Sequence, residues 1–211
     1  MAYTSEPDLL VMHAVRLKGF AECEQIVEAT GLAEDVTIDI LNGFHADGTV
    51  TRREGRISGW ALTPGGRERH RKRLLDERDA AACTEVLDRG YEGFLCCNES
   101  FKQLCTDWQL RIVGGDLVAN DHTDTGYDGA IGGRLQELHL EVLPVLEALS
   151  SALERFGTYP DRLGAANERF RQGQREALVR PLSGSYHDVW MELHQDLLLT
   201  LDRERAEADG T

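Results

Sequence analysis

Apolar residues recur along the first third of the chain at the spacing of short amphipathic helices. The pattern predicts helices over residues 9–17, 21–30 and 33–46. Gly19 ends the first helix and Gly31 caps the second, because glycine adopts the left-handed conformation that closes many helices. In the third, Val36, Ile40 and Phe44 recur every four positions and share one face. The chain is therefore expected to begin with three short helices.

Two short strands are predicted after the third helix. Residues 49–53 have β-branched strand character, residues 54–56 form a turn, and residues 57–62 read as the returning strand. Thr63 is placed as the N-cap of the next helix, with Pro64 at its first position. This hairpin and the three helices make up an expected N-terminal domain of residues 1–75.

The remaining residues, 76–211, are expected to form an all-α domain. Helical patterns cover residues 67–78, which lead out of the first domain, and then 80–110, 135–156, 160–179 and 186–201. Residues 113–133 contain six glycines and four aspartates and are predicted to be a long loop, of a kind that is often functional. The expected fold class is mainly α.

Composition places the chain among ordinary globular proteins. It has 211 residues, 41% hydrophobic and 28% charged, which is enough to bury a sizeable core. No apolar run is long enough to span a membrane, and the N-terminus lacks the pattern of a signal peptide. Five cysteines without paired Cys-x-x-Cys motifs fit reduced thiols. These observations predict a cytoplasmic protein.

Charge is distributed unevenly along the chain. The formal net charge is −14, which argues against attraction of the whole protein to nucleic acid or to anionic membranes. Residues 50–73, however, carry eight basic residues against two acidic ones, for a net charge of +6. Screening limits electrostatic reach to about 8 Å at physiological salt, so this basic segment is able to bind phosphate locally.

The hairpin and the residues after it resemble a known class of regulator. The sequence GWALTPGGR at residues 59–67 is similar to the strand-to-helix signature of MarR-like and PadR-like transcription regulators. The preceding sequence LNGFHADGTVTRR, residues 41–53, resembles the end of their recognition helix and the entry to their wing. The resemblance covers about residues 8–75. It implies a winged helix-turn-helix that binds double-stranded DNA, although winged helices also serve as protein-binding modules.

Candidate DNA-binding residues follow from this resemblance and from the basic segment. Arg52, Arg53, Arg56 and Arg67 are expected to contact phosphates, and Thr37 and Asn42 to read bases from the predicted recognition helix. That helix carries Glu34, Asp35 and Asp39 and no basic residue, which argues against sequence-specific binding. Acidic residues also stabilise the first turn of a helix through its dipole, so the observation has a structural explanation as well.

Aromatic and histidine side chains of the second domain are candidates for an effector pocket. An apolar cavity with a few polar groups is typical of ligand sites in helical domains, whereas packing in a bundle core is the alternative. The candidate residues are Trp108, His122, Tyr127, His139, Tyr186, His187, Trp190 and His194. His187 and His194 lie two helical turns apart, about 10 Å, which is too far for one metal ion. A carboxylate stripe, Asp188, Glu192 and Asp196, is interpreted as a solvated face.

No motif for catalysis, a metal or a cofactor is recognised. The glycine-rich segment lacks the patterns of a calcium loop and of a nucleotide-binding loop, and no Gly-x-Ser-x-Gly elbow occurs. The sequence therefore predicts a non-enzymatic transcription regulator. Its helical domain is expected to form a homodimer and to sense a small-molecule effector. The alternative is a regulatory subunit that uses the winged fold to bind protein instead of DNA.

Overall fold

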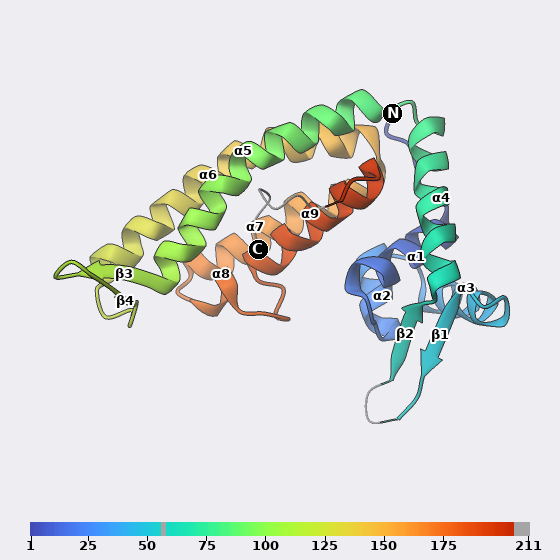
Figure 1. The fold of residues 1–211 in the computed structure, drawn as a ribbon, viewed down its shortest axis with the longest axis horizontal. Helices are drawn as coiled ribbons and strands as arrows, with labels where there is room; N and C mark the ends of the chain where they lie inside the picture. The colour runs from blue at the N-terminus through green and yellow to red at the C-terminus, as the bar shows by residue number, and fades with distance from the viewer. Residues whose placement is uncertain (56–57, 205–211) are drawn as a thin grey trace. The chain divides into compact units, whose positions relative to one another are not determined.

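The chain divides into two compact units. A computed structural model describes residues 1–55 and 58–204 and is mainly helical, with two short antiparallel hairpins, which confirms the expected class. Unit 1 comprises Met1–Thr84, Ala152–Arg155 and Gln195–Glu204, and unit 2 comprises Glu85–Ser151 and Phe156–His194 (Figure 1). Unit 1 thus extends beyond the predicted boundary at residue 75 and includes two short segments from far along the chain.

Unit 1 begins with three helices, a hairpin and a fourth helix. These elements are α1 (Pro7–Lys18), α2 (Cys23–Thr30), α3 (Glu34–Ala46), β1 (Val50–Arg53), β2 (Gly59–Leu62) and α4 (Pro64–Ala80). Their order confirms the helices and strands expected from the sequence. Gly31 closes α2 in the left-handed conformation, and the Thr63 hydroxyl accepts a hydrogen bond from the Gly66 amide at 2.9 Å. Thr63 is therefore the N-cap that the sequence predicted.

The hairpin of unit 1 is held against the helices by its second strand. β1 and β2 pair antiparallel, with Val50 opposite Leu62 and Arg53 opposite Gly59. Trp60 exchanges two backbone hydrogen bonds with Ala21, at 2.8 and 3.0 Å. Gly66 at the start of α4 lies so close to the Thr49 carbonyl that any side chain there would collide with it. This glycine lets α4 begin directly against β1.

A single apolar core joins these elements of unit 1. It contains Val11, Met12, Ala14, Val15, Ala21, Ile26, Leu41, Phe44, Val50, Trp60 and Leu62. The first helix contributes a buried stripe, α2 contributes Ile26, and α3 contributes Leu41 and Phe44. Only Val50 of β1 is buried, whereas residues 51–53 are exposed. The hairpin is thus anchored at its base, and its first strand presents side chains to solvent.

Unit 2 contains two long helices joined by a second hairpin. Its elements are α5 (Thr84–Gln109), β3 (Leu110–Val113), β4 (Asp116–Ala119), α6 (Thr125–Ala152), the 3-10 helix η1 (Glu154–Gly157), α7 (Thr158–Arg171), α8 (Glu176–Val179) and α9 (Tyr186–Leu201). The ends of α6 and α9 and part of η1 belong to unit 1. The predicted loop over residues 113–133 is therefore wrong. Gly114 and Gly115, both with positive φ, form a two-residue turn between β3 and β4. The later glycines lie within α6.

Close packing of α5 on α6 depends on two glycines. A side chain at Gly90 would overlap Leu149, and one at Gly93 would press on Val145. The apolar stripe of α6, which includes Leu135, Val142 and Leu149, is fully buried. Deeper in unit 2, the rings of Phe94 and Phe101 lie within 5 Å of the Trp190 ring. The apolar stripe of α6 and the aromatic residues of α5 and α9 thus form the interior of unit 2.

Candidate functional site

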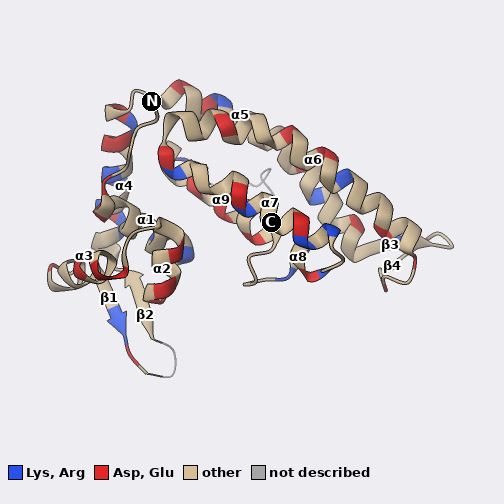
Figure 2. Ribbon diagram, turned by 180° about the vertical axis from the view of Figure 1, so that it is seen from behind, with Lys and Arg blue, Asp and Glu red and all other residues tan. Residues whose placement is uncertain are grey.

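The first strand of the unit 1 hairpin carries two exposed basic residues that were predicted to touch DNA. Arg52 and Arg53 are both exposed on β1, which appears in the colour of basic residues in Figure 2. The Arg52 guanidinium lies over the Trp60 ring at 5.2 Å and pairs with the exposed Glu54 at 3.2 Å. The Trp60 contact restricts the orientation of Arg52. Arg56 lies outside the described residues.

Three arginines of α4 are neutralised within unit 1. Arg69 contacts Asp47 at 2.6 Å, and Arg71 contacts Asp202 at 2.5 Å. Arg73 makes two hydrogen bonds of 2.7 Å to Asp8, and these bonds lower the pKa of that carboxyl. A paired guanidinium has little capacity to attract phosphate. The basic surface is therefore smaller than the sequence suggested.

Arg67 remains exposed at the start of α4, near a second basic residue. Burial lowers the pKa of Arg16 on α1, and the positive charge of Arg67 lowers it further. The positive charges of Arg16 and Arg67 therefore affect each other and create a local positive potential. An anion bound there would relieve the repulsion between these two residues.

The third helix presents a surface different from the one the sequence predicted. Thr37 is fully buried, and its hydroxyl donates a hydrogen bond to the Ala33 carbonyl at 3.0 Å. Its candidate role as a base reader is therefore wrong. Asn42 is exposed, and so are Glu34 and Asp35 in the first turn. Figure 2 shows acidic residues along α3. Of the two residues proposed to read bases, only Asn42 is available on the helix surface.

The eight residues expected to line an effector pocket do not form one site. Tyr186, Trp190 and His194 are at most 1% exposed and are packed inside unit 2. The Trp190 indole donates a 2.8 Å hydrogen bond to the buried Asn98 side chain. The pocket assignment is wrong for these three residues because neighbouring rings pack against them. The centroid of the Phe94 ring lies 4.8 Å from that of Trp190 and 5.2 Å from that of His194, and the Tyr186 ring stacks on Trp190. His139 and His187 are partly buried at the edge of the same cluster, where His139 lies 3.3 Å from the Tyr186 hydroxyl.

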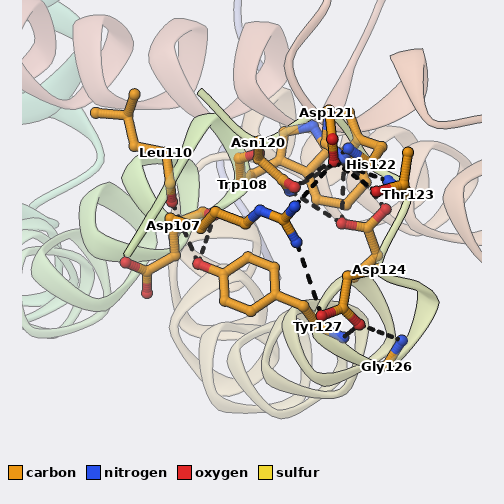
Figure 3. A network of polar contacts seen from close by, with 12 residues as sticks. Asp107, Trp108, Leu110, Asn120, Asp121, His122, Thr123, Asp124, Gly126 and Tyr127 are labelled. Atoms are coloured by element: carbon orange, nitrogen blue, oxygen red, sulfur yellow. Dashed lines mark hydrogen bonds and ion pairs between the residues drawn. The ribbon is translucent and has the colours of Figure 1, made fainter. Parts of the chain in front are cut away.

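The other three members of the predicted pocket meet at the base of the β3–β4 hairpin (Figure 3). The Trp108 and His122 rings lie 4.2 Å apart between their centroids. The Tyr127 hydroxyl reaches the carbonyls of Asp107 and Leu110, at 3.0 and 3.2 Å, and donates to this pair. These contacts join the end of α5 to the first turns of α6. They explain how the hairpin is fixed to the two long helices.

Asn120 is the centre of this network, although no sequence pattern marks it as a functional or structural residue. Its buried side-chain amide donates to the Trp108 carbonyl at 3.1 Å and to Asp128 at 3.0 Å. Asp128 also lies 3.1 Å from His122. Burial opposes ionisation of Asp128, but the bonds from Asn120 and His122 outweigh it and lower the carboxyl pKa. The network therefore holds a carboxylate beside an imidazole.

Acidic side chains complete the hairpin base. Asp124 caps α6 by accepting hydrogen bonds from the Gly126 and Tyr127 amides, at 3.1 and 3.0 Å. Arg111 of β3 contacts Asp121 at 3.1 Å and Asp124 at 3.7 Å. Each acceptor in this group therefore has a donor within the network. The arrangement is that of a structural junction.

A second polar network lies in the interior of unit 1. Arg155 contacts Glu77 at 3.1 Å and Asp196 at 2.5 Å, and all three side chains are at most 4% exposed. Asp196 also lies 3.0 Å from His13, whose other ring nitrogen is 2.9 Å from His70. The interpretation of Asp196 as part of a solvated face is therefore wrong. Sequence periodicity has no signal for this network because its members come from four distant segments.

Neither a metal centre nor a membrane-spanning helix is found in the part of the chain that the structure describes. Across residues 1–55 and 58–204, no group of three or more His, Cys, Asp and Glu side chains is arranged to hold a metal ion. None of the described helices is long and apolar enough to cross a membrane. Comparison of the chain with protein-family models, curated proteins and solved structures gives no match.

Proposed function

We propose that unit 1 is a winged helix-turn-helix that binds double-stranded DNA, and that the chain is a dimeric transcription regulator. The observation that carries this proposal is the exposed pair Arg52 and Arg53 on the first strand of a hairpin. This hairpin follows three helices that share its core, and α4 begins directly after it. In winged domains the hairpin contacts the DNA backbone or minor groove beside the recognition helix.

Binding through so few charges is consistent with the acidic character of the chain. Arg69, Arg71 and Arg73 pair with carboxylates of other elements of unit 1, whereas Arg52 pairs, among the described residues, only with Glu54, an exposed residue of its own hairpin. An exposed pair of this kind is weak, so phosphate contacts fall to the hairpin and to the exposed Arg67 and Lys72. A phosphate contact acts over less than a Debye length of about 8 Å, and distant acidic residues weaken it little. The proposed mode is thus local and sensitive to salt. It relies on backbone contacts more than on base reading, since α3 offers only Asn42.

Removing the two hairpin arginines tests this function. Binding of the full chain to a duplex is measured at several salt concentrations for the wild type and for Arg52→Ala with Arg53→Ala. Each lost phosphate contact lowers the magnitude of the slope of log K against log salt by about 0.9. The slope of the variant should therefore be smaller in magnitude by about 1.8. Arg89→Ala with Arg171→Ala is the matched control, because both residues are exposed in unit 2 and the charge change is the same. A variant that keeps the wild-type slope would contradict the hairpin assignment.

A second candidate function has its own observation. The surface of α3 exposes Val36 and Ile38, at 41% and 39%, among the acids Glu34, Asp35 and Asp39. Apolar side chains within an acidic surface suit a partner protein with basic and apolar groups better than they suit DNA. We propose this protein-binding role as the alternative. It predicts that the wild-type chain shows no salt-dependent duplex binding in the same titration.

A further inference from the structure

The β3–β4 hairpin exposes an unusual amount of apolar side chain. Among the described residues, nine large hydrophobic side chains are exposed, and four of them lie in these two short strands. Ile112 is 75% exposed and Leu117 is 66% exposed, whereas Val113 and Val118 are exposed to 50% and 38%. Monomeric proteins rarely group exposed apolar side chains in this way, and such groups mark interaction sites. The hairpin is therefore a candidate contact surface.

One face of the hairpin is entirely apolar. Residues paired across an antiparallel ladder point to the same side, and successive residues alternate. The register pairs Leu110 with Ala119 and Ile112 with Leu117, so these four residues form one face, the apolar hairpin face. The opposite face holds Arg111, Val113, Asp116 and Val118, so two of the four exposed apolar side chains and both charged residues lie there. The apolar hairpin face thus carries no ionisable group.

The exposure of this face does not reflect a loosely attached hairpin. Its base is tied by the Tyr127 hydroxyl, which bonds to the Asp107 and Leu110 carbonyls (Figure 3). The backbone amide of Asn120 also donates a hydrogen bond to the Gln109 carbonyl at 2.8 Å. An isolated two-stranded hairpin is marginally stable in water. The network at the base therefore fixes the hairpin in position and leaves its apolar side chains without cover from the described residues of unit 2.

The absence of charge on this face suits it to a second copy of the chain. The chain has a net charge of −14, so two copies repel each other wherever their acidic surfaces meet. Approach through an uncharged face avoids this repulsion. Acidic residues at the hairpin base are already paired, Asp107 with Arg134 and Asp121 with Arg111. A two-fold interface sets a patch against itself, and an apolar patch without charges is complementary to its own copy.

Helical stripes of unit 2 do not compete for this role. The apolar stripe of α6 and the aromatic residues of α9 would serve as a subunit interface only if they were exposed. Leu135, Leu149 and Trp190 are fully buried within the single chain, so they are core. Two other exposed apolar residues of unit 2, Leu140 and Leu182, do not belong to the strand face. The hairpin thus holds the largest group of exposed apolar residues in unit 2.

We propose that the apolar hairpin face packs on the same face of a second copy around a two-fold axis and forms the dimer interface. This inference deepens the proposed function, on which it rests, by naming the surface that joins the two DNA-binding units. Facing sheets in proteins pack about 10 Å apart with interdigitated side chains, a geometry open to Ile112 and Leu117 from each copy. The contact is isologous, so it closes at two copies and does not extend into filaments.

Sedimentation of the full chain tests this interface. Wild-type protein at micromolar concentration should sediment at twice the chain mass of 23.5 kDa. Ile112→Glu with Leu117→Glu places four carboxylates in the interface and should raise the dimer Kd by about a hundredfold or more. The matched control is Leu140→Glu with Leu182→Glu, which changes the charge equally at exposed apolar sites outside the hairpin and should remain dimeric. Circular dichroism checks that both variants stay folded.

Hydrogen exchange supplies a second readout that needs no substitution. Hairpin amides of the wild type should exchange more slowly as protein concentration rises, because dimerisation protects them. A wild type that is monomeric would overturn the inference. A monomer that sediments together with lipid vesicles would overturn it as well. A hairpin variant that stays dimeric, or a control that dissociates equally, would also overturn it.

The two proposals fail in different ways. A wild type that forms the hairpin dimer without binding duplex DNA would refute the proposed function and leave the interface standing. A monomer that binds DNA would refute the interface and the dimeric state, and would leave the DNA-binding assignment of unit 1 standing. If the wild type is dimeric, Arg52→Ala with Arg53→Ala should be dimeric as well, because these residues lie in unit 1.

Discussion

Arg155 is the residue on which the polar interior of unit 1 depends most. Its guanidinium contacts two buried carboxylates, Glu77 and Asp196, and donates to the Thr200 hydroxyl at 2.6 Å. Burial alone would raise the pKa of Asp196, but the charges of Arg155 and His13 keep it well below its usual value. Asp196 is therefore held as an anion in the interior, and the Arg155 guanidinium lies against both it and Glu77.

Replacing Arg155 by methionine should destabilise unit 1 strongly. The change leaves two buried carboxylates without their cation, and removal of one partner from a buried ion pair costs about 3–5 kcal/mol. Chemical denaturation of the wild type and the variant measures this loss. Arg89→Met is the control, since Arg89 pairs with Glu85 at the surface and such pairs contribute about 0–1 kcal/mol. A loss no larger than that of the control would contradict the described network.

His70 makes the stability of unit 1 depend on pH. Burial lowers its pKa to about 2, with further lowering by the positive charges of His13, Arg16 and Arg155, whereas Asp196 opposes the shift. The unfolded chain takes up this proton near pH 6.5 and the folded chain does not. The neutral ring therefore contributes stability above pH 6.5, and this contribution falls as the pH is lowered below that value.

Changing His70 to glutamine should remove this part of the pH dependence. Between pH 7.5 and 5.5, the wild type should lose about 1.4 kcal/mol of unfolding free energy more than the variant does. Denaturant titrations of both proteins at the two pH values measure the difference. Equal losses would show that His70 is not kept neutral by the fold.

Single residues differed in how far the sequence could assign them. The Thr63 cap was predictable because a capping threonine acts on its own helix, within three residues. Thr37 and Asp196 were misassigned because each lies on a helix face whose burial is decided by other elements. Helical spacing shows which residues lie on the same face of a helix. It does not show whether another element buries that face when the residues on it are polar.

At the scale of elements, α3 and the β1–β2 hairpin carry opposite charges, which should act in opposite directions on the proposed DNA binding. The hairpin offers Arg52 and Arg53, whereas α3 begins with exposed Glu34 and Asp35. These acids stabilise the positive end of the helix dipole, and Asp35 also accepts a hydrogen bond from the Val36 amide at 2.9 Å. If α3 faces the duplex, the same acids repel phosphates. Measuring duplex binding without these two carboxylates therefore shows whether they repel DNA.

Neutralising Glu34 and Asp35 by changing both to glutamine should tighten non-specific duplex binding. The expected cause is the loss of like-charge repulsion at the DNA surface. Fluorescence anisotropy with a duplex of arbitrary sequence measures the change, and Glu92→Gln, an exposed acid of α5, serves as the control. Unchanged or weaker binding would mean that these acids face away from DNA and serve the helix alone.

Elements of unit 1 were predictable because helix-ending glycines and a capping threonine mark their ends. The hairpin in unit 2 was not, since its Gly114-Gly115 turn lies in a segment rich in glycine and aspartate that also fits a loop. Asn120 and Asp128, which secure that hairpin, are ordinary polar residues in the sequence. Their role depends on the meeting of α5 and α6, which no local pattern encodes.

At the scale of the whole molecule, unit 1 is built from three separate stretches of chain. Segments Ala152–Arg155 and Gln195–Glu204 supply Arg155 and Asp196 to its interior. A backbone bridge between Tyr3 and Leu153 adds a further link between distant segments. The predicted boundary at residue 75 would cut this unit before Glu77. A continuous N-terminal fragment therefore lacks part of the unit, and function is best tested on the full chain.

Titration of duplex DNA with the wild-type chain at increasing salt tests the central claim most directly. If the hairpin arginines contact phosphates, log K should fall linearly with log salt between about 50 and 200 mM, with a slope magnitude of at least about 1.8 from two contacts. Binding that is saturable and follows this slope is the result we predict. Absence of saturable binding at the lowest salt, or binding that does not change with salt, would contradict the assignment of unit 1 as a DNA-binding domain.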